Sequence, residues 1–292
     1  MKTTYLFSLF IVACSICSCQ TKKEKFLISG SGWTQIAIID KETETIEWSY
    51  PLGRGEDCND AELTPEGNIL YAYTKGARLI DRQKETIWDY RAGEYEELFT
   101  ATRLPSGNYM LGICGNPSRI VELNSEGKQV KEITFETGIT NVHSQFRQML
   151  KTDRNTYIVP LIGKGIIIEI NEQGNILDSI PCGGVPFSVK ILDNGNWLVS
   201  CGDAHNFVEI NPKQKQIIQT VGSEDIGTVS LKFVAELIRY KNGNTLIANW
   251  SGHSRDKTQP LLLEIDRDNH VVWSLSRTPE IADISTVFSF FE

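Results

Sequence analysis

A short phrase that recurs six times constrains the fold of this chain more than any other feature. Each copy is an apolar run that closes on Asp or Asn, and the closing residues are Asp40, Asp81, Asn124, Asn171, Asn211 and Asp266. The intervals between them are 41, 43, 47, 40 and 55 positions. A period of this length is the signature of a repeat architecture built from one supersecondary unit.

A second phrase alternates with the first. It is a Gly-Asn or Arg-Asn pair before an apolar run, and it begins at Gly67, Gly107, Arg154, Gly195 and Gly243. Hairpin turns need residues that tolerate positive φ, and Gly and Asn do so at the least cost. Short strands between such turns predict an all-β chain whose repeats are four-stranded propeller blades.

Residues 60–90 show the predicted blade most clearly. Its four strands are expected at Asp60–Thr64, Ile69–Thr74, Ala77–Asp81 and Thr86–Tyr90. The same order follows at 100–135, 145–181, 186–221 and 234–275, which makes five complete units.

The two ends of the chain supply the parts of a sixth blade. The N-terminal part has only the second, third and fourth strands, at Phe26–Ser29, Gln35–Asp40 and Thr45–Tyr50, and the C-terminal part has one unpaired strand, Thr286–Phe291. Pairing them closes the ring and removes the exposed sheet edges that invite aggregation. The sequence therefore predicts a six-bladed β-propeller, closed by the C-terminal strand, in a single domain over 26–292.

The first nineteen residues have the layout of a lipoprotein signal peptide. An apolar run that follows Lys2 is too short to span a membrane and ends among three cysteines. We expect lipidation at Cys19, with Cys14 as the alternative, and a polar tether over residues 20–25. Lipid on that cysteine would anchor the domain to the bacterial cell envelope. We expect the outer membrane, with the domain facing the periplasm.

Composition excludes some partners. The formal net charge of −8 becomes −9 when residues 1–19, whose only charge is Lys2, are removed. Nucleic acid needs a basic surface, so it is not expected as a partner.

The mature part has four cysteines and contains no CxxC pair, which leaves a zinc site without support. Neither a metal site nor a cofactor is expected. Whether Cys182 and Cys201 form a disulfide stays open at this point.

The segment from Ile38 to Trp48 resembles the repeat of quinoprotein-like (PQQ-like repeat) propellers, which belong among the WD40/YVTN-like folds. In that repeat an acid ends the third strand and a Trp on the fourth strand docks against the next blade, and Trp88 and Trp273 continue the pattern. Relatives that bind pyrroloquinoline quinone surround it with a Trp floor, a Cys-Cys pair and calcium-ligating acids. Those residues do not occur as a group in this sequence, so the resemblance implies the fold and not the cofactor.

Strand order predicts which loops share a face of the propeller. The links between blades and the links from second to third strands lie together, and three of the four histidines fall on that face. The candidate ligand-binding residues, expected near the axial channel, are Asp57, Asn59, Asp60, Arg103, His143, Asp203, His205, Glu236, Trp250 and His253.

Three functions are compatible with these residues. The first, which we favour, is an anchored module that binds a small molecule or a membrane-associated protein. The second rests on a resemblance of the segments around His143 and Gly252–Arg255 to bacterial arylsulfotransferases. It implies His143 as the nucleophile and Arg147, His253 and Arg255 as the sulfate clamp. The third is a metal-assisted sugar lyase or lactonase, with Asn59, Asp60 and Glu236 as the nearest ligands.

Overall fold

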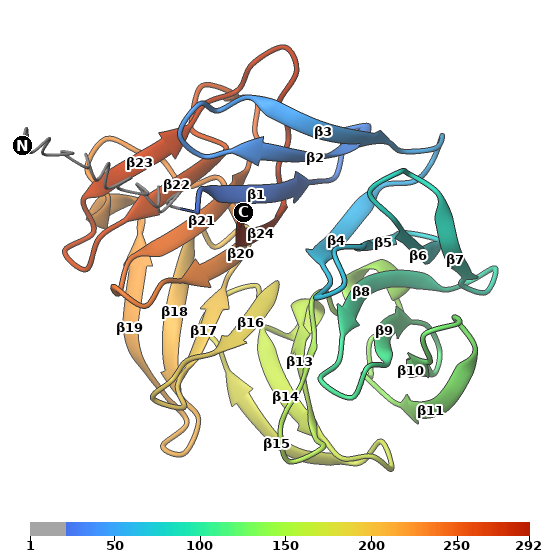
Figure 1. Ribbon diagram of the computed structural model, residues 1–292. Helices are drawn as coiled ribbons and strands as arrows, with labels where there is room; N and C mark the ends of the chain where they lie inside the picture. The colour runs from blue at the N-terminus through green and yellow to red at the C-terminus, as the bar shows by residue number, and fades with distance from the viewer. Residues whose placement is uncertain (1–21) are drawn as a thin grey trace, which may run out of the picture.

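The computed structural model describes residues 22–292, and these form six antiparallel four-stranded sheets around a central axis (Figure 1). The strands of the first three sheets in chain order are β1 (Glu24–Ser29), β2 (Gln35–Asp40), β3 (Ile46–Pro51), β4 (Cys58–Leu63), β5 (Ile69–Tyr73), β6 (Gly76–Ile80), β7 (Thr86–Arg91), β8 (Glu97–Arg103), β9 (Tyr109–Cys114), β10 (Ser118–Leu123) and β11 (Gln129–Phe135). Those of the remaining three sheets are β12 (Leu150–Lys151), β13 (Tyr157–Leu161), β14 (Ile166–Ile170), β15 (Ile176–Pro181), β16 (Ser188–Ile191), β17 (Trp197–Ser200), β18 (Asn206–Asn211), β19 (Gln216–Gly222), β20 (Phe233–Arg239), β21 (Thr245–Trp250), β22 (Leu262–Ile265) and β23 (Val271–Leu275). The last strand, β24 (Thr286–Phe291), is the fourth strand of the first sheet. The predicted six-bladed all-β propeller is confirmed.

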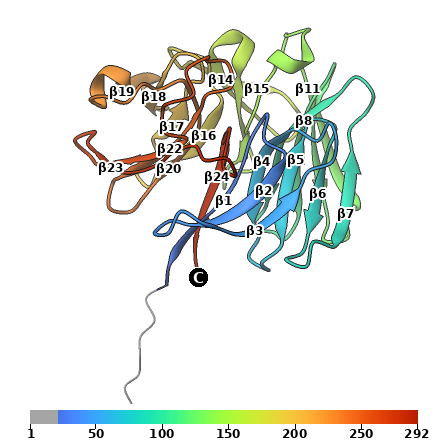
Figure 2. The same ribbon diagram turned by 90° about the horizontal axis from the view of Figure 1, so that it is seen from above.

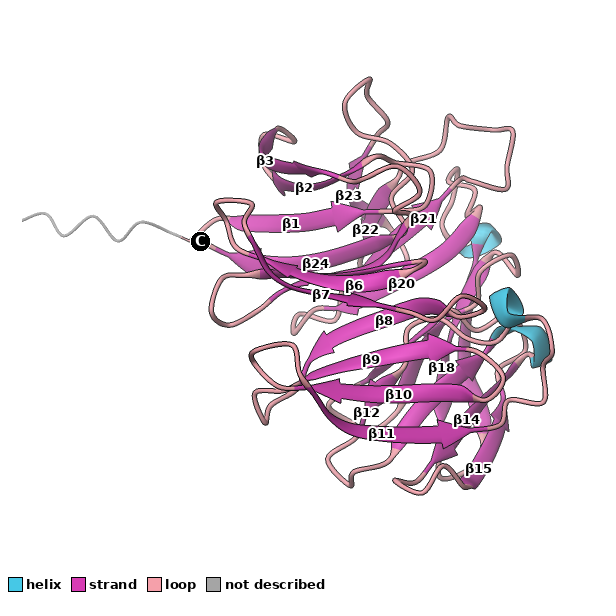
Figure 3. Cartoon of the chain, turned by 90° about the vertical axis from the view of Figure 1, so that its right-hand side faces the viewer, coloured by secondary structure: helices cyan, strands magenta, loops and turns pink. Residues whose placement is uncertain are grey.

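Three single-turn 3₁₀ helices are the only helices in the described part of the chain. They are η1 (Val142–Ser144), η2 (Ile162–Lys164) and η3 (Ser223–Asp225). Figure 3 shows the short helices at one face of the propeller and the C-terminus at the other. Within residues 22–292 no helix has the length and apolar character that a membrane crossing requires.

The ring closes through the first sheet, whose strand order is β24-β1-β2-β3. Strand β24 pairs antiparallel with β1 over six residues, from Glu24 opposite Phe291 to Ser29 opposite Thr286. The two strands lie side by side in Figure 2. The backbone of Lys23 adds two further hydrogen bonds to that of Glu292, at 2.7 and 3.1 Å. The C-terminal strand therefore completes the N-terminal blade, as predicted.

The closing residue of each recurrent phrase caps the turn between the third and fourth strands of its blade. All six side chains accept backbone N–H groups from their own turns, at 2.8 to 3.1 Å: Asp40, Asp81, Asn124, Asn171, Asn211 and Asp266. A short side-chain oxygen satisfies turn donors that the hairpin leaves unpaired. The sequence repeat is therefore a repeat of turn chemistry.

Tryptophans on the fourth strands join neighbouring blades. Trp48 donates its indole N–H to the carbonyl of Arg82 in the second blade at 3.0 Å. The ring of Trp88 lies 5.2 Å from that of Tyr109 in the third blade. Trp273 lies 5.4 Å from Phe26, so the same contact joins the sixth blade to the first.

Most predicted strands match within two residues, and the inner strand β4 is one of those whose start differs by two. It begins at Cys58 and not at Asp60, because the pairing with β5 shifts register between these two residues. Equivalent irregularities interrupt β8 at Leu98/Thr100 and β20 at Val234/Leu237. Bulges of this kind turn side chains to new directions, often beside binding sites.

The cysteines singled out from the sequence fall partly outside and partly inside the described residues. The signal peptide and both lipidation candidates, Cys19 and Cys14, lie outside the described residues. Cys182 and Cys201 are both free and buried, and both belong to the same apolar cluster between the fourth and fifth blades.

Candidate functional site

A small cavity of about 260 Å³ opens where the inner strands begin. Its wall takes residues from five of the six blades, which is possible only near the propeller axis. Seven of the residues singled out from the sequence line it: Asp57, Asn59, His143, Arg147, Asp203, Trp250 and His253. The rest of the wall consists of the apolar side chains of Phe187, Phe233, Ile162 and Val185 and of small hydroxyl residues, which are Ser31, Thr74, Ser144 and Ser285. We call this space the axial cavity.

One side of the axial cavity is formed by His143 and Arg147, which follow η1. The Arg147 guanidinium donates to His143 Nε2 at 3.1 Å, and His143 Nδ1 lies 2.8 Å from the carboxylate of Glu97. Because arginine only donates, Nε2 must be an acceptor, and a neutral His143 then carries its proton on Nδ1 toward Glu97. The three side chains form one hydrogen-bonded chain that orients the guanidinium.

Arg147 is deeply buried, with 9% of its surface exposed. Its charged group lies over the face of Phe99, 3.8 Å from the ring centroid, which is a cation–π contact. Burial lowers the pKa of Arg147 to about 10. The group therefore remains a cation at neutral pH.

The part of the axial cavity wall that comes from the fifth and sixth blades combines an acid–histidine pair with aromatic rings. His253 Nδ1 lies 3.1 Å from both carboxylate oxygens of Asp203. The His253 ring contacts Trp250 and Phe233 edge-on, at centroid distances of 4.8 and 5.5 Å. Phe187 meets Phe233 in the same geometry at 5.2 Å. This part of the wall offers a continuous aromatic surface with one imidazole at its rim.

Asp57 belongs to the axial cavity, but its carboxylate already has protein partners. It accepts the hydroxyl of Ser31 at 2.7 Å and the N–H of Gly32 at 2.9 Å. These bonds join the first and second blades across the site. Asp57 therefore helps to hold these two blades together, in addition to any contact that it makes with a ligand.

Asp60 and Glu236 lie deeper, in the channel between the inner strands. Lys190 pairs with Glu236 at 2.6 Å, and Gln148 reaches both Glu236 and Asp60 at 3.2 and 3.4 Å. Burial raises the pKa of Asp60 well above its usual range, and the nearby Glu236 carboxylate adds to the effect. The channel is a hydrogen-bonded polar core that supports the axial cavity from below.

Besides Asp60 and Glu236, three further predicted residues lie outside the axial cavity: Arg103, Arg255 and His205. Arg103 is the last residue of β8 and lies at the opposite end of the inner strand, where it pairs with Glu66 at 2.6 Å. It was expected at the entry of that strand, but the strand already begins at Glu97. Arg255 is exposed and is not part of the cavity wall.

His205 lies beside the axial cavity and not in it. Its ring contacts the carbonyl of Lys232 and lines an outer cavity of about 610 Å³. That outer cavity shares Asp203, Trp250 and His253 with the axial one. The two spaces therefore meet at the Asp203–His253 pair.

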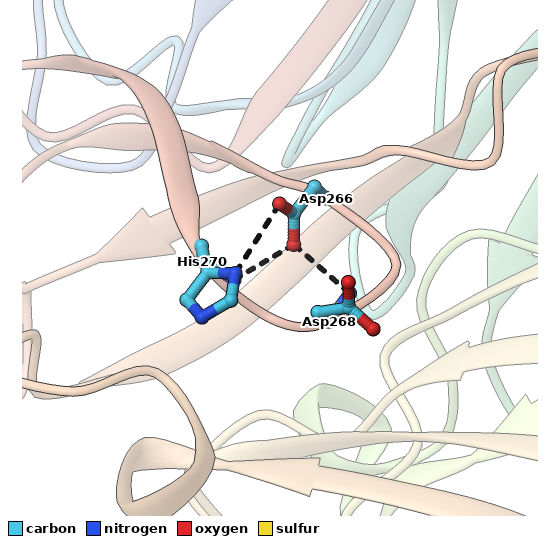
Figure 4. A group of neighbouring side chains, drawn as sticks. All are labelled: Asp266, Asp268 and His270. Atoms are coloured by element: carbon cyan, nitrogen blue, oxygen red, sulfur yellow. Dashed lines mark hydrogen bonds and ion pairs between the residues drawn. The ribbon is translucent and has the colours of Figure 1, made fainter.

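The fourth histidine, His270, belongs to a group on the opposite face with Asp266 and Asp268 (Figure 4). Asp266 accepts the N–H groups of Asp268 and His270, both at 2.9 Å. These are the cap bonds found in all six turns. The cap bonds of this turn therefore account for the proximity of the three side chains.

Sequence reasoning missed several residues that shape the site. Glu97, Phe187 and Phe233 stand at or near the start of inner strands, and Gln148 and Lys190 face the channel. The signal that could have found them is their position in the repeat, because equivalent positions of inner strands face the same axis.

Comparisons with known proteins agree with this fold. Residues 21–270 match a family described as Mal s 1 allergenic protein-like. A crystal structure of a protein of unknown function from Bacteroides caccae is 42% identical, with a TM-score of 0.88 over 92% of this chain and 99% of that chain. A search of the curated proteins found no match.

More distant solved structures share the architecture alone. A catalytically inactive histidine-to-alanine variant of virginiamycin B lyase from Staphylococcus aureus, solved with quinupristin, is 12% identical, with a TM-score of 0.62 over 94% of both chains. A chain of a nidogen/laminin complex is 10% identical, with a TM-score of 0.64 over 91% of this chain and 98% of that one. Neither the quinoprotein-like nor the arylsulfotransferase resemblance receives specific support, and the propeller is the part of that expectation that is shown.

Proposed function

The chain belongs to the Mal s 1 allergenic protein-like family, and we propose that it is a lipid-anchored, exported module that binds a small molecule in the axial cavity. The observation that carries the proposal is the composition of the cavity wall. The wall contains the aromatic rings of Phe187, Phe233 and Trp250, and it also contains oriented polar groups, among them those of His143, Arg147 and Asp57. Ligand sites in proteins are typically apolar concavities with a few fixed polar groups.

The rigidity of the ring supports binding without rearrangement. The cavity wall comes from five blades, and the blades are held together by the closing strand and the inter-blade tryptophans. A preformed site loses little conformational freedom when a ligand enters.

The bonding of His143 favours a binding function over an arylsulfotransferase-like reaction. A nucleophilic imidazole needs a nitrogen lone pair that is free to attack. In His143 the Nε2 lone pair accepts an N–H of Arg147, and Nδ1 faces Glu97. His143 is therefore better suited to orient Arg147 than to attack a sulfate ester.

A thermal-shift screen of the mature domain, residues 20–292, tests the proposal. The panel spans glycans, aryl sulfates, quinones and divalent metals, because a compound that binds only the folded form raises the melting temperature. We expect a hit that disappears with His143→Ala and persists with His270→Ala, a histidine on the opposite face. A hit that responds equally to both variants contradicts a site in the axial cavity.

A lyase or lactonase is the second candidate, and the Asp203–His253 pair favours it. The pair orients the imidazole with Nδ1 toward the acid, as in a general base. Elimination from a uronate glycan creates a conjugated double bond that ultraviolet absorbance detects. A stoichiometric metal and turnover that His253→Ala abolishes would favour this function, whereas a metal-free, inactive protein would exclude it for these substrates.

The proposed lipid anchor and the axial cavity belong to opposite ends of the first blade. The bond between Lys23 and Glu292 puts the start of the domain at one end of β1, and Ser31, just beyond the other end, lines the axial cavity. A lipid on Cys19 would then hold the cavity away from the outer membrane, toward the periplasm. Mass spectrometry of the processed N-terminus, compared between Cys19→Ser and Cys14→Ser, identifies the lipidated residue. An unlipidated N-terminus in the wild-type protein contradicts the anchor.

A further inference from the structure

The buried cation of Arg147 has no negative partner in the described part of the chain. The carboxylate of Glu97 reaches the guanidinium only through the ring of His143. Burying a charge is costly unless the group is paired or fully hydrogen-bonded. An arginine in this position therefore points to an anion that comes from outside the chain.

The hydrogen bonds of the guanidinium leave room for that anion. Nη1 donates to the carbonyls of His143 and Phe146 at 2.8 and 3.0 Å, and Nη2 donates once, to His143 Nε2. Arginine has five N–H donors in a planar fork. Two donors, on Nε and Nη2, are therefore without a partner among residues 22–292, in a side chain that lines the axial cavity.

The acids of the axial cavity do not fill this need. Asp57 is bonded to Ser31 and Gly32, and Asp203 is bonded to His253. Both acids are engaged by donors of their own, on other blades than Arg147. The wall also offers the aromatic surface of Phe187, Phe233 and Trp250, which begins beside Arg147, where the Gln148 N–H donates to the Phe187 carbonyl at 3.1 Å.

We propose that the axial cavity takes a small organic anion with an aromatic or apolar ring, whose anionic oxygens accept the two remaining N–H groups of Arg147. The ring lies on the aromatic surface, where stacking adds to the burial of apolar area. The His143–Glu97 pair positions the guanidinium for this contact. This inference rests on the proposed binding function and names the ligand class.

The volume limits the size of the ligand. About 260 Å³ is below the range of roughly 300 to 1,000 Å³ typical of pockets for drug-sized molecules. A compound with a single ring and one acidic group fits this space. Larger ligands would extend into the outer cavity past the Asp203–His253 pair.

Three compounds with the same ring and different charge test the inference: phenylacetate, phenylacetamide and phenethylamine. Titration calorimetry on residues 20–292 should give the tightest binding for phenylacetate. Equal or tighter binding of the neutral amide or of the amine overturns the inference and leaves the proposed function standing. No detectable binding of phenylacetate also overturns it, while the broader thermal-shift screen continues to test the proposed function.

Variants of Arg147 identify the residue. Arg147→Gln should weaken phenylacetate binding about tenfold or more, since hydrogen bonds to charged groups are the strong ones. It should change phenylacetamide binding much less. Arg147→Lys keeps the charge but lacks the planar fork of N–H donors. Its affinity for phenylacetate should lie between those of the wild type and of Arg147→Gln.

A measurement on the wild-type protein guards against a variant that fails to fold. The Nε–H resonance of Arg147, assigned by its absence from Arg147→Lys, should move on addition of phenylacetate and stay in place with phenylacetamide. If both compounds move it equally, or neither does, the guanidinium does not recognise the anion.

Discussion

At the scale of single residues, the six turn caps show how a weak repeat encodes a regular structure. Apolar strands vary in sequence because many residues fit a buried strand. The cap position is more restricted, because an oxygen on a short side chain must reach the N–H groups of its own turn. Asp and Asn both supply such an oxygen, so either residue can close the recurrent phrase.

Asn171 tests the role of the caps. Its side-chain oxygen accepts the N–H groups of Gln173 and Asn175 at 3.0 and 2.9 Å. Asn171→Ala should lower the free energy of unfolding by about 1 kcal/mol, because a hydrogen bond contributes about that much. Asn171→Asp keeps the acceptor and should melt close to the wild type. Equal melting temperatures for the two variants would show that the cap is dispensable.

Glu62, on the inner strand β4, should make the stability of the folded protein depend on pH. Burial raises its pKa to about 7, against hydrogen bonds from Thr102 and Arg103 that favour the charged form. Between about pH 4.5 and 7 the unfolded chain has lost this proton and the folded chain keeps it. Stability present below this window is therefore lost as the pH rises through it, by at most about 1.4 kcal/mol per pH unit.

Denaturant unfolding across pH 4 to 8 measures this contribution. Glu62→Gln should remove the fall in stability that the wild type shows between about pH 4.5 and 7. Glu66→Gln is the control, because the hydrogen bond from Arg103 lowers the pKa of Glu66. Identical pH profiles for wild type and Glu62→Gln would show that Glu62 titrates normally.

At the scale of elements, the capped turns and the tryptophans of the fourth strands together hold neighbouring blades in contact. Trp48 bonds to the turn of the second blade at Arg82, and Lys41 in the turn of the first blade lies over Trp273 at 5.5 Å. Trp88 lies against Gly127 in the turn of the third blade. A cap therefore shapes the surface against which the preceding blade packs.

Gly127 should be intolerant of a side chain for this reason. Its φ is +76°, and an added Cβ would lie 2.6 Å from Cβ of Trp88. Gly67 is a matched control, with a φ of +85° and nothing within 4 Å of an added Cβ. Gly67→Ala should cost only the backbone strain, about 1 to 2 kcal/mol, and Gly127→Ala should cost distinctly more.

Thermal unfolding of the two alanine variants distinguishes the two costs. The loss caused by Gly127→Ala should be smaller in a Trp88→Gly background than in the wild type, since glycine at position 88 removes the Cβ atom and the ring that the new side chain would meet. Equal melting temperatures for Gly67→Ala and Gly127→Ala would show that the turn moves away from Trp88 freely.

At the scale of the whole molecule, stability depends on closing the ring. Besides pairing with β1, strand β24 brings Thr286 and Val287 to Glu236, whose carboxylate accepts the Thr286 hydroxyl at 2.9 Å and the Val287 N–H at 3.0 Å. The closing strand thus joins the first blade to the channel that supports the axial cavity.

Deleting residues 285–292 should make the mature domain aggregate or lose its cooperative melt, because the edge of β1 and part of the channel become exposed. Calorimetry with light scattering measures both effects. Deleting Glu292 alone leaves the strand in place and should have little effect. An unchanged melting curve for the long deletion contradicts closure as the source of stability.

The chain's own periodicity was enough to predict six blades and their turns, because turns and hairpins form between residues close in sequence. The closing strand followed from the strand count, since the N-terminal blade lacks one strand and the C-terminus supplies one. It also placed His143, Asp203 and His253 on one face, since strand order assigns each loop to a face. It could not show that Glu97 meets His143, 46 positions away, or that Phe187 and Phe233 share a wall. It placed Arg103 at the wrong end of its strand. Such contacts depend on where each inner strand starts and on its bulges, and they form only when the closed ring turns those strands toward one axis.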